Sequence, residues 1–331
     1  MIITRTPFRM SFFGGGTDIA SFYKIYGGAV LSSSFDKYCY VNIRHLPKFF
    51  NYRTHLTYSK TESVNSYDEI NHPLIREAMK YLDMHDIRLM YDADLPARTG
   101  LGTSSSFAVG LLNAFYALKG KRVDKKRLSD EAIYLERVLC KEAGGIQDQI
   151  AASYGGLNRI DITSNGYIVS PIIISNQRKK ELNENLMLFF TGFTRFSADI
   201  QKKTGENINK KIEQLKEMKQ MVDEAEHILT SKMNLNEFGK LLHYSWTLKR
   251  DLSESISTDA IDDIYKKARE AGAIGGKLLG AGGGGFLLFY VERECKNNVL
   301  NVLKNLLHVP IEFENNGTQV VYYTAEDYNL E

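Results

Sequence analysis

The order of hydrophobic and polar positions along the chain predicts a protein that mixes strands and helices. Alternation with β-branched and aromatic residues indicates strands, and apolar residues at every third or fourth position indicate helices that face a core. Strands are expected at 1–13 with a break at Pro7, in one or two pieces over 27–52, and at 87–91, 157–162, 167–172, 186–190 and 319–323. Helices are expected at 19–26, 72–83, 107–118, 123–142, 197–230, 236–252 and 295–307.

A polar, lysine-rich segment over 171–185 interrupts this pattern and provides the best domain boundary. A length of 331 residues favours about two domains. We therefore expect an N-terminal domain over 1–175 and a C-terminal domain over 176–331.

The most informative stretch is 95–110, in which Gly100 and Gly102 flank one leucine and three serines follow. The apolar segment that continues to Leu118 predicts a buried helix whose N-terminal end points out of the core. Free amides and the helix dipole make such an end an anion site, and the hydroxyls add donors and ligands for Mg²⁺. The alternative is a serine-capped core helix after a glycine turn. The glycine spacing is not that of a Walker loop.

A second glycine run, 14–16, follows the first strand and precedes Thr17 and Asp18. One interpretation is a ligand loop in which Asp18 holds hydroxyls and Arg9, on the strand before it, holds negative charge. The other is a tight turn in which Asp18 caps the next helix and Arg9 is solvated.

Two carboxylates complete the candidate chemistry. Glu136 has only apolar neighbours at helical spacing, so it needs a partner such as a metal ion or an arginine; a salt bridge at the rim is the alternative. Asp148 follows a Gly-Gly break twelve residues later and could share a site with Glu136, or could simply be favoured at a helix start.

The glycine-rich segment 272–285 contains the formal dinucleotide fingerprint Gly280-x-Gly282-x-x-Gly285. That fingerprint requires a helix after it, whereas 286–291 is strand-like. We therefore expect a β-hairpin whose glycine tip packs against phosphates or against another loop, and we reject NAD binding.

Composition narrows the class of partner. A net charge of +2 gives no sign of a nucleic-acid surface. The three cysteines lie far apart, which favours reduced thiols, and neither a signal peptide nor an 18-residue apolar window is present. We expect a cytoplasmic protein that binds neither membrane nor nucleic acid. The sequence does not decide the oligomeric state, and a homodimer is one of the states it allows.

Four stretches that together span most of the chain resemble the GHMP kinases, a family of small-molecule kinases. They are the run from Pro7 to Asp18, the run 96–107 with its Gly-Leu-Gly-Thr-Ser-Ser-Ser core, the segment 145–149 and the run 277–286. The resemblance implies an α+β fold of two domains: an N-terminal ribosomal-protein-like α/β domain that binds ATP, and a C-terminal ferredoxin-like α/β domain. It also implies ATP and Mg²⁺ as cofactors.

The resemblance further implies roles for individual residues. Asp148 and Arg9 would be catalytic, and Ser104 and Glu136 would hold the metal. The nucleotide would be bound by Gly100, Leu101, Gly102, Thr103, Ser104, Ser105 and Ser106. The substrate would be bound by Gly15, Gly16, Thr17, Asp18, Arg195 and Gly283.

Within the family, the run 6–18 looks like the branch that phosphorylates the anomeric hydroxyl of D-glycero-D-manno-heptose 7-phosphate, for surface polysaccharide synthesis. The 7-phosphate would need a second anion site, for which Arg195, Lys37 and Lys277 are candidates. A fucose- or galactose-type sugar 1-kinase and a non-catalytic sugar sensor are the alternatives.

Overall fold

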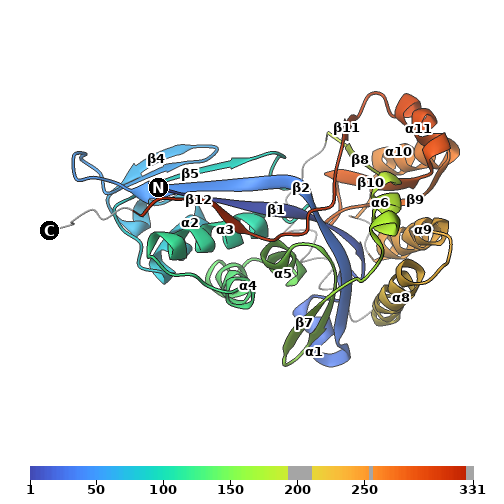
Figure 1. Ribbon diagram of the computed structural model, residues 1–331, viewed down its shortest axis with the longest axis horizontal. Coiled ribbons are helices and arrows are strands. Elements are labelled where there is room, and N and C mark those ends of the chain that lie inside the picture. Colours follow the sequence, from blue (N-terminus) through green and yellow to red (C-terminus); the bar gives the residue numbers. More distant parts are fainter. Residues whose placement is uncertain (193–210, 253–255, 326–331) are drawn as a thin grey trace.

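The computed structural model describes residues 1–192, 211–252 and 256–325, and it forms an elongated molecule built on two β-sheets (Figure 1). The helices are α1 (Ala20–Tyr26), α2 (Pro73–Tyr81), α3 (Thr103–Leu118), α4 (Lys125–Tyr134), α5 (Gln147–Tyr154), α6 (Asn176–Glu184), α8 (Ile212–Thr230), α9 (Asn236–Asp251), α10 (Asp259–Glu270) and α11 (Lys296–Val302). The strands are β1 (Ile2–Phe13), β2 (Gly28–His45), β3 (Thr54–Thr57), β4 (Thr61–Val64), β5 (Ile87–Ala93), β6 (Leu157–Thr163), β7 (Gly166–Pro171), β8 (Leu186–Phe190), β9 (Ala273–Leu278), β10 (Phe286–Val291), β11 (Leu307–Val309) and β12 (Gln319–Tyr323).

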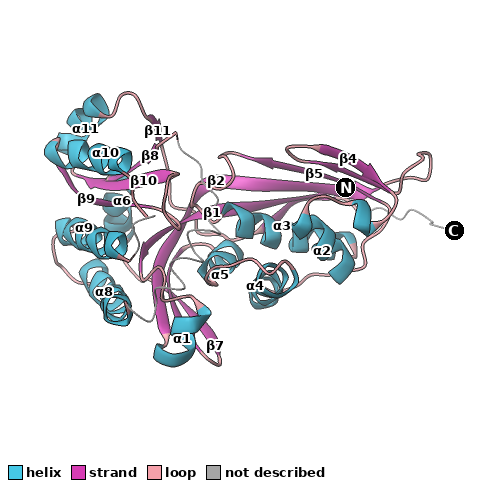
Figure 2. Ribbon diagram, turned by 180° about the vertical axis from the view of Figure 1, so that it is seen from behind, coloured by secondary structure: helices cyan, strands magenta, loops and turns pink. Residues whose placement is uncertain are grey.

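The first sheet has the order β12-β1-β2-β5-β3-β4, and β6 and β7 extend it from β2. Strand β2 changes partner along its length, because residues 28–33 pair with β6 and residues 39–45 pair with β5. Helices α2, α3, α4 and α5 lie together on one face of this sheet (Figures 1 and 2). Helix α3 is buried around most of its circumference, as its uninterrupted apolar sequence predicts.

The second sheet is antiparallel, with the order β11-β8-β10-β9. Helices α9 and α10 contact β9, and α8 and α9 also contact β1 of the first sheet. Trp246, Tyr265 and Phe289 pack in the core of this part. The hairpin of β9 and β10 confirms the expectation for the glycine-rich segment 272–285.

The predicted domain boundary falls between the two sheets, since β7 ends at Pro171 and β8 begins at Leu186. The chain then returns, because β12 pairs with β1. A division by sheets therefore places residues 319–323 with the N-terminal part.

Several helices and strands differ from those expected from the sequence. The helix expected over 123–142 ends as an α-helix at Tyr134, and a π-helical turn, Leu135–Leu139, follows it. The helix expected over 295–307 ends at Val302, and the polar boundary segment contains α6, which Ser175 caps. The expected helix over 197–230 can be followed only as α8, because its beginning lies outside the described residues. Strands β3 and β4 and helix α10 were not predicted.

Candidate active site

The N-terminal end of α3 is open, as the sequence predicts for an anion site. The helix begins at Thr103, and Gly102 before it has a left-handed φ of 73° and supplies no side-chain cap. The first amides of the helix are therefore available to a ligand, and the helix dipole favours a negative charge there.

Two glycine loops pack back to back beside this helix end. Gly100 and Gly280 both have positive φ, 84° and 73°. A Cβ atom on Gly280 would lie 2.2 Å from the Cα atom of Gly100, and a Cβ atom on Gly100 would lie 2.4 Å from the carbonyl oxygen of Leu279. Neither loop has room for a side chain, so the glycine tip of the β9–β10 hairpin packs against another loop, one of the two uses expected for it.

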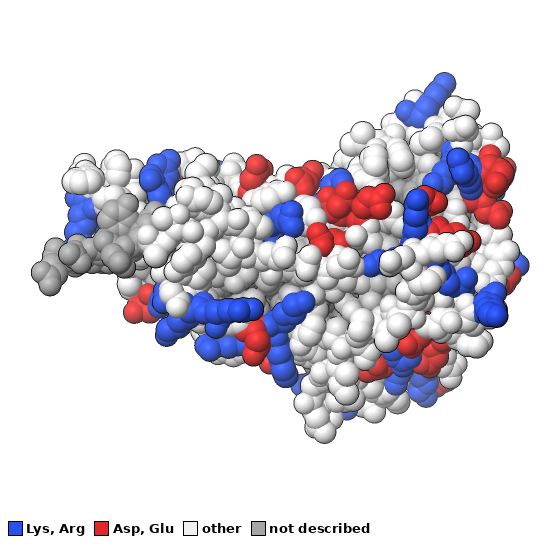
Figure 3. All heavy atoms as spheres, viewed as in Figure 1, with Lys and Arg blue, Asp and Glu red and all other residues white. Residues whose placement is uncertain are grey.

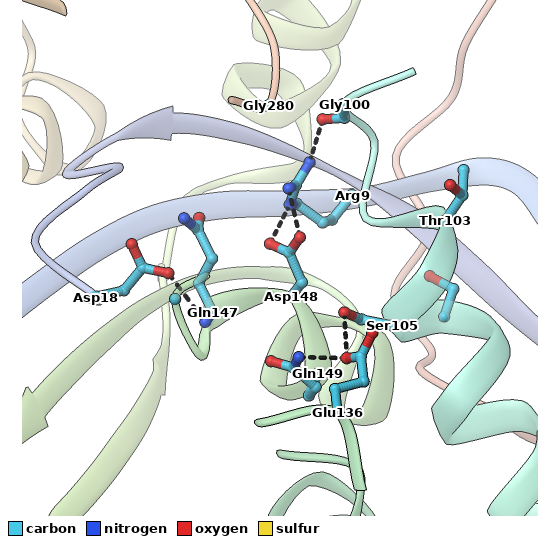
Figure 4. A network of polar contacts seen from close by, with 12 residues as sticks. Arg9, Asp18, Gly100, Thr103, Ser105, Glu136, Gln147, Asp148, Gln149 and Gly280 are labelled. Carbon is cyan, nitrogen blue, oxygen red and sulfur yellow. Dashed lines mark hydrogen bonds and ion pairs between the residues drawn. The ribbon is translucent and has the colours of Figure 1, made fainter. Parts of the chain in front are cut away.

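Arg9 and Asp148 form the centre of the site (Figure 4). The Nε and Nη2 atoms of Arg9 donate to the two carboxylate oxygens of Asp148 at 2.8 and 2.7 Å, and Nη1 donates to the carbonyl oxygen of Gly100 at 2.6 Å. The Arg9 side chain is 5% exposed and that of Asp148 is 20% exposed. A bidentate pair holds both groups in one geometry. The carboxylate at the start of α5 is thereby fixed beside the loop that leads into α3.

Glu136 lies on the π-helical turn, with 1% of its surface exposed. The Ser105 hydroxyl donates to its Oε2 atom at 2.7 Å, and the side-chain amide of Gln149 donates to the same oxygen (Figure 4). Single π turns inside helices occur frequently at functional sites. No cation of the described chain pairs with this carboxylate, so its negative charge is left for a positive ligand to balance.

The three serines after Gly102 differ in their surroundings. Ser104 is exposed, Ser105 contacts Glu136, and the buried Ser106 donates to the carbonyl oxygen of Pro7 at 2.9 Å. The hydroxyl that reaches Glu136 is therefore that of Ser105, although Ser104 was the expected metal ligand. Ser106 holds α3 against β1.

Asp18 is buried in the glycine loop between β1 and α1. Its two oxygens accept hydrogen bonds from the backbone amides of Gly16 at 3.0 Å and Gln147 at 3.2 Å. Burial, and then the negative charge of Asp148, raise the pKa of the Asp18 carboxyl. A Cβ atom on Gly145 would lie 1.8 Å from an Asp18 oxygen, so only glycine lets the loop before α5 approach this closely.

Two lysines enter the same cleft from the second sheet and its covering helix. Lys249, in the last turn of α9, donates to the carbonyl oxygens of Leu278 and Gly280. Lys277, on β9 and 2% exposed, donates to the carbonyl oxygen of Phe12 at 2.6 Å. Burial, and then the charge of Arg9, lower the pKa of Lys249 to about 7. Burial, and then the charges of Lys249 and Arg9, lower the pKa of Lys277 well below its ordinary value.

Arg9, Asp18, Asp148, Lys249 and Lys277 line one cleft between the two sheets. Its lining also includes Gly15, Gly16, Gln147 and Arg137, and it brings four cations together with the two carboxylates Asp18 and Asp148. The arrangement can hold an anionic ligand and can place a hydroxyl beside Asp148. On the face shown in Figure 3, by contrast, basic and acidic side chains are both scattered.

Other expected substrate-binding residues lie elsewhere. The buried Thr17 hydroxyl contacts the carbonyl oxygens of Gly14 and Ala29, at 2.8 and 2.9 Å, and so holds the loop together. The backbone amide of Gly283 donates to the carbonyl oxygen of Ile256, and Gly283 does not line the cleft. Lys37 pairs with its neighbour Asp36 outside the cleft. Arg195 lies outside the described residues.

Among the cleft residues that sequence reasoning missed are Lys249, Arg137 and Gln147. Lys249 was interpreted as part of a solvated helix face, which is wrong. Arg137 donates to three carbonyl oxygens of the loop 142–145 and holds it in place. Gln147 presents a buried Oε1 atom without a partner in the described chain. Only Gln147 had a sequence signal, its place beside Asp148 in the segment 145–149.

Comparison with known proteins identifies the family of this chain. The sequence family "GHMP kinases N terminal domain" matches residues 73–156, and "GHMP kinases C terminal" matches residues 221–308. A D-glycero-alpha-D-manno-heptose 7-phosphate kinase of Campylobacter jejuni is 31% identical over 92% of this chain and 93% of its own length. An L-fucokinase/L-fucose-1-P guanylyltransferase of Bacteroides fragilis is 30% identical over 59% of this chain and 21% of its own length.

The fold agrees as well. A crystal structure of a D-glycero-D-manno-heptose 1-phosphate kinase from Bacteroides thetaiotaomicron superposes with a TM-score of 0.81 and 25% identity, over 98% of this chain and all of that one. No helix in the described ranges has the length and apolar character needed to cross a bilayer. The two family matches, the near full-length relative and the shared α+β architecture establish that this chain belongs to the GHMP kinase family.

Proposed function

We propose that this protein transfers the γ-phosphoryl group of ATP to the anomeric hydroxyl of D-glycero-D-manno-heptose 7-phosphate and forms the 1,7-bisphosphate. The observation that carries the proposal is the excess of basic side chains in the cleft between the two sheets, which we call the acceptor cleft. Four basic side chains line it together with the two carboxylates Asp18 and Asp148: Arg9, Arg137, Lys249 and Lys277. A sugar that already bears a phosphate suits this charge better than a neutral sugar does. The 31% identity to a heptose 7-phosphate kinase along almost the whole chain supports the same substrate.

In this proposal Asp148 orients the anomeric hydroxyl, whose oxygen attacks the γ-phosphorus while the bond to the β-phosphate oxygen breaks and ADP leaves. The proton of the hydroxyl passes to Asp148 or to water. Arg9 stabilises the negative charge that develops on the transferred group. The open amides at the start of α3 bind the phosphates of ATP, and Asp18 accepts hydrogen bonds from sugar hydroxyls.

The donor set at Glu136 fits Mg²⁺. This ion is held in proteins by one or two carboxylates together with substrate phosphates and water, and Glu136 is a buried carboxylate with no cationic partner in the described chain. Ser105 supplies a hydroxyl beside it, and Ser104, at the exposed start of α3, is the other proposed hydroxyl ligand. When bound there, Mg²⁺ neutralises charge on the phosphates of ATP.

The test is a coupled assay of ADP release over a panel of hexoses, heptoses and their phosphates. The product is identified by phosphorus NMR. We expect the heptose 7-phosphate to have the highest kcat/KM and the product to carry a new anomeric phosphate. A product phosphorylated at another carbon, or an unphosphorylated sugar as the best substrate, would contradict the proposal.

A second candidate is a fucose-type sugar 1-kinase, which the similarity to the Bacteroides fragilis protein favours. The same panel separates the two, because L-fucose carries no phosphate. The retention of Asp148 in a bidentate pair with Arg9, and of a buried Glu136 that accepts from Ser105, argues against a non-catalytic sugar sensor.

A further inference from the structure

Two lysine side chains that line the cleft between the two sheets have only carbonyl partners. Lys277 is buried and donates to Phe12, and Lys249 is partly buried and donates to Leu278 and Gly280. Neither lysine pairs with a carboxylate of the described residues. After burial, the charge of Arg9 lowers the pKa of both lysines, and the charge of Lys249 also lowers the pKa of Lys277.

Such an arrangement is costly unless an anion completes it. A buried cation without a counter-ion loses its hydration and gains little in return. Of the two carboxylates that line the cleft, Asp148 already accepts two hydrogen bonds from Arg9, and Asp18 accepts one from each of two backbone amides. The two lysines therefore form a preformed site for a ligand that brings about two negative charges, which is the charge of a phosphate monoester near neutral pH.

The location of the pair distinguishes the two phosphate sources in the reaction. The cleft that both lysines line includes the glycine loop of Asp18, but its lining contains none of residues 100–106, where the phosphates of ATP are expected. Lys277 contacts Phe12, which lies on the strand that leads into the 14–16 loop. The first observation places the pair outside the expected phosphate loop, and the second places Lys277 on the side of the acceptor. Lys249 donates to Gly280, which packs against Gly100, so the MgADP titration decides whether this lysine also contacts the nucleotide.

We propose that Lys249 and Lys277 bind the phosphate group that the acceptor sugar already carries and thereby select a phosphorylated sugar over its unphosphorylated form. The inference rests on the proposed function, which it extends by naming the residues of the second anion site. The two ammonium groups approach from different elements, α9 and β9, so a phosphate between them is held from two sides.

The experiment compares Lys249→Met and Lys277→Met with the wild type in the full chain. Methionine keeps most of the length and apolar volume of each side chain. Lys240→Met is the matched control, since Lys240 lies on the same helix but pairs with Glu237 at the surface. Calorimetry without ATP measures the affinity for heptose 7-phosphate and for the unphosphorylated heptose, and a separate titration measures the affinity for MgADP.

We expect each cleft substitution to weaken heptose 7-phosphate binding by about 10- to 100-fold, as the loss of one charged hydrogen bond does. Binding of the unphosphorylated heptose and of MgADP should change by less than about threefold, and retained MgADP binding shows that the variant is folded. Lys249→Arg, which keeps a charge, should restore part of the affinity. Lys240→Met should behave as the wild type.

Other results would overturn the inference. If both methionine variants keep the wild-type preference for the phosphorylated sugar, the pair does not bind its phosphate. If they lose MgADP affinity instead, the pair holds the nucleotide.

Failure of the proposed function gives a different pattern. If the wild type prefers another sugar phosphate and the two variants lose that preference, the heptose is wrong but the subsite stands. If the wild type phosphorylates phosphorylated and unphosphorylated heptose equally well, the kinase activity stands and the subsite is wrong.

Discussion

At the scale of single residues, the pairing of Arg9 with Asp148 implies that the two act together. We expect Asp148→Asn to lower kcat by about 10²- to 10⁴-fold, because the amide cannot accept a proton and leaves the Arg9 guanidinium with a weaker partner. The KM for ATP should change little, since the nucleotide is expected at α3. Steady-state kinetics of both substrates measure this effect.

The control for this variant is Asp86→Asn, which weakens another bidentate pair, with Arg53, at 2.8 and 2.9 Å. That pair lies far from the cleft lining, so kcat should remain unchanged. Comparable turnover in Asp148→Asn and the wild type would refute the assigned role.

The lowered pKa of Lys249 predicts a dependence of stability on pH. Its pKa is about 7 in the folded protein and 10.5 as the ordinary value, so between these limits the unfolded chain binds the extra proton. The contribution of Lys249 to the free energy of unfolding therefore rises with pH from about 7 towards 10.5. The difference in this free energy, Lys249→Met minus wild type, should be largest below pH 7 and should shrink across that window.

Urea unfolding of both proteins at several pH values measures this difference. Arg9 of β1 is the charged group that lowers the pKa of Lys249 after burial, and Lys277 of β9 and Arg137 line the same cleft. The carboxylates of the cleft are Asp148, which pairs with Arg9, and Asp18, which accepts hydrogen bonds from two backbone amides. A difference that stays constant from pH 6 to pH 10 would show that Lys249 keeps an ordinary pKa.

At the scale of elements, the contact between two glycine loops makes the nucleotide site sensitive to one methyl group. Gly280→Ala combines a strained positive φ with a Cβ atom 2.2 Å from Gly100. We expect it to lower the free energy of unfolding by about 2–4 kcal/mol and to raise the KM for ATP. Gly120→Ala is the matched control: its φ is 66°, but nothing lies within 4 Å of the added atom. It should cost only about 1 kcal/mol and leave the KM unchanged.

Elements also show where sequence patterns suffice and where they do not. Helix α3 and the β9–β10 hairpin were predictable, because apolar residues on all sides indicate a buried helix and a glycine tip between two apolar runs indicates a turn. The π turn that carries Glu136 was not. The spacing of the apolar residues fits an ordinary α-helix across this turn, at Leu128, Ala132, Leu135 and Leu139. The one extra residue of a π turn shifts the apolar positions too little to be detected in the sequence.

The same limit applies to the lysines. Lys249 follows a run of solvated lysines and glutamates on α8 and α9 in the sequence. Its burial comes from Leu278 and Gly280, about thirty residues away along the chain, and periodicity carries no information on such a contact. Asp148 and Asp18 were predictable because each follows a short glycine run, and Arg9 because it lies on the strand that leads into the first of these runs.

At the scale of the whole molecule, a nearly balanced overall charge coexists with a cleft in which basic side chains outnumber carboxylates. The chain carries +2 overall, whereas four cations and two carboxylates line the cleft. The electrostatic field at the mouth of the cleft is therefore local, and salt should weaken the capture of a charged acceptor more than that of a neutral one.

Raising KCl from about 50 to about 500 mM should lower kcat/KM for the phosphorylated sugar several-fold. The value of kcat/KM for its unphosphorylated form should stay nearly unchanged. The Lys249→Met variant should show a shallower dependence. Equal salt effects on both sugars would mean that the positive cleft does not act on the acceptor.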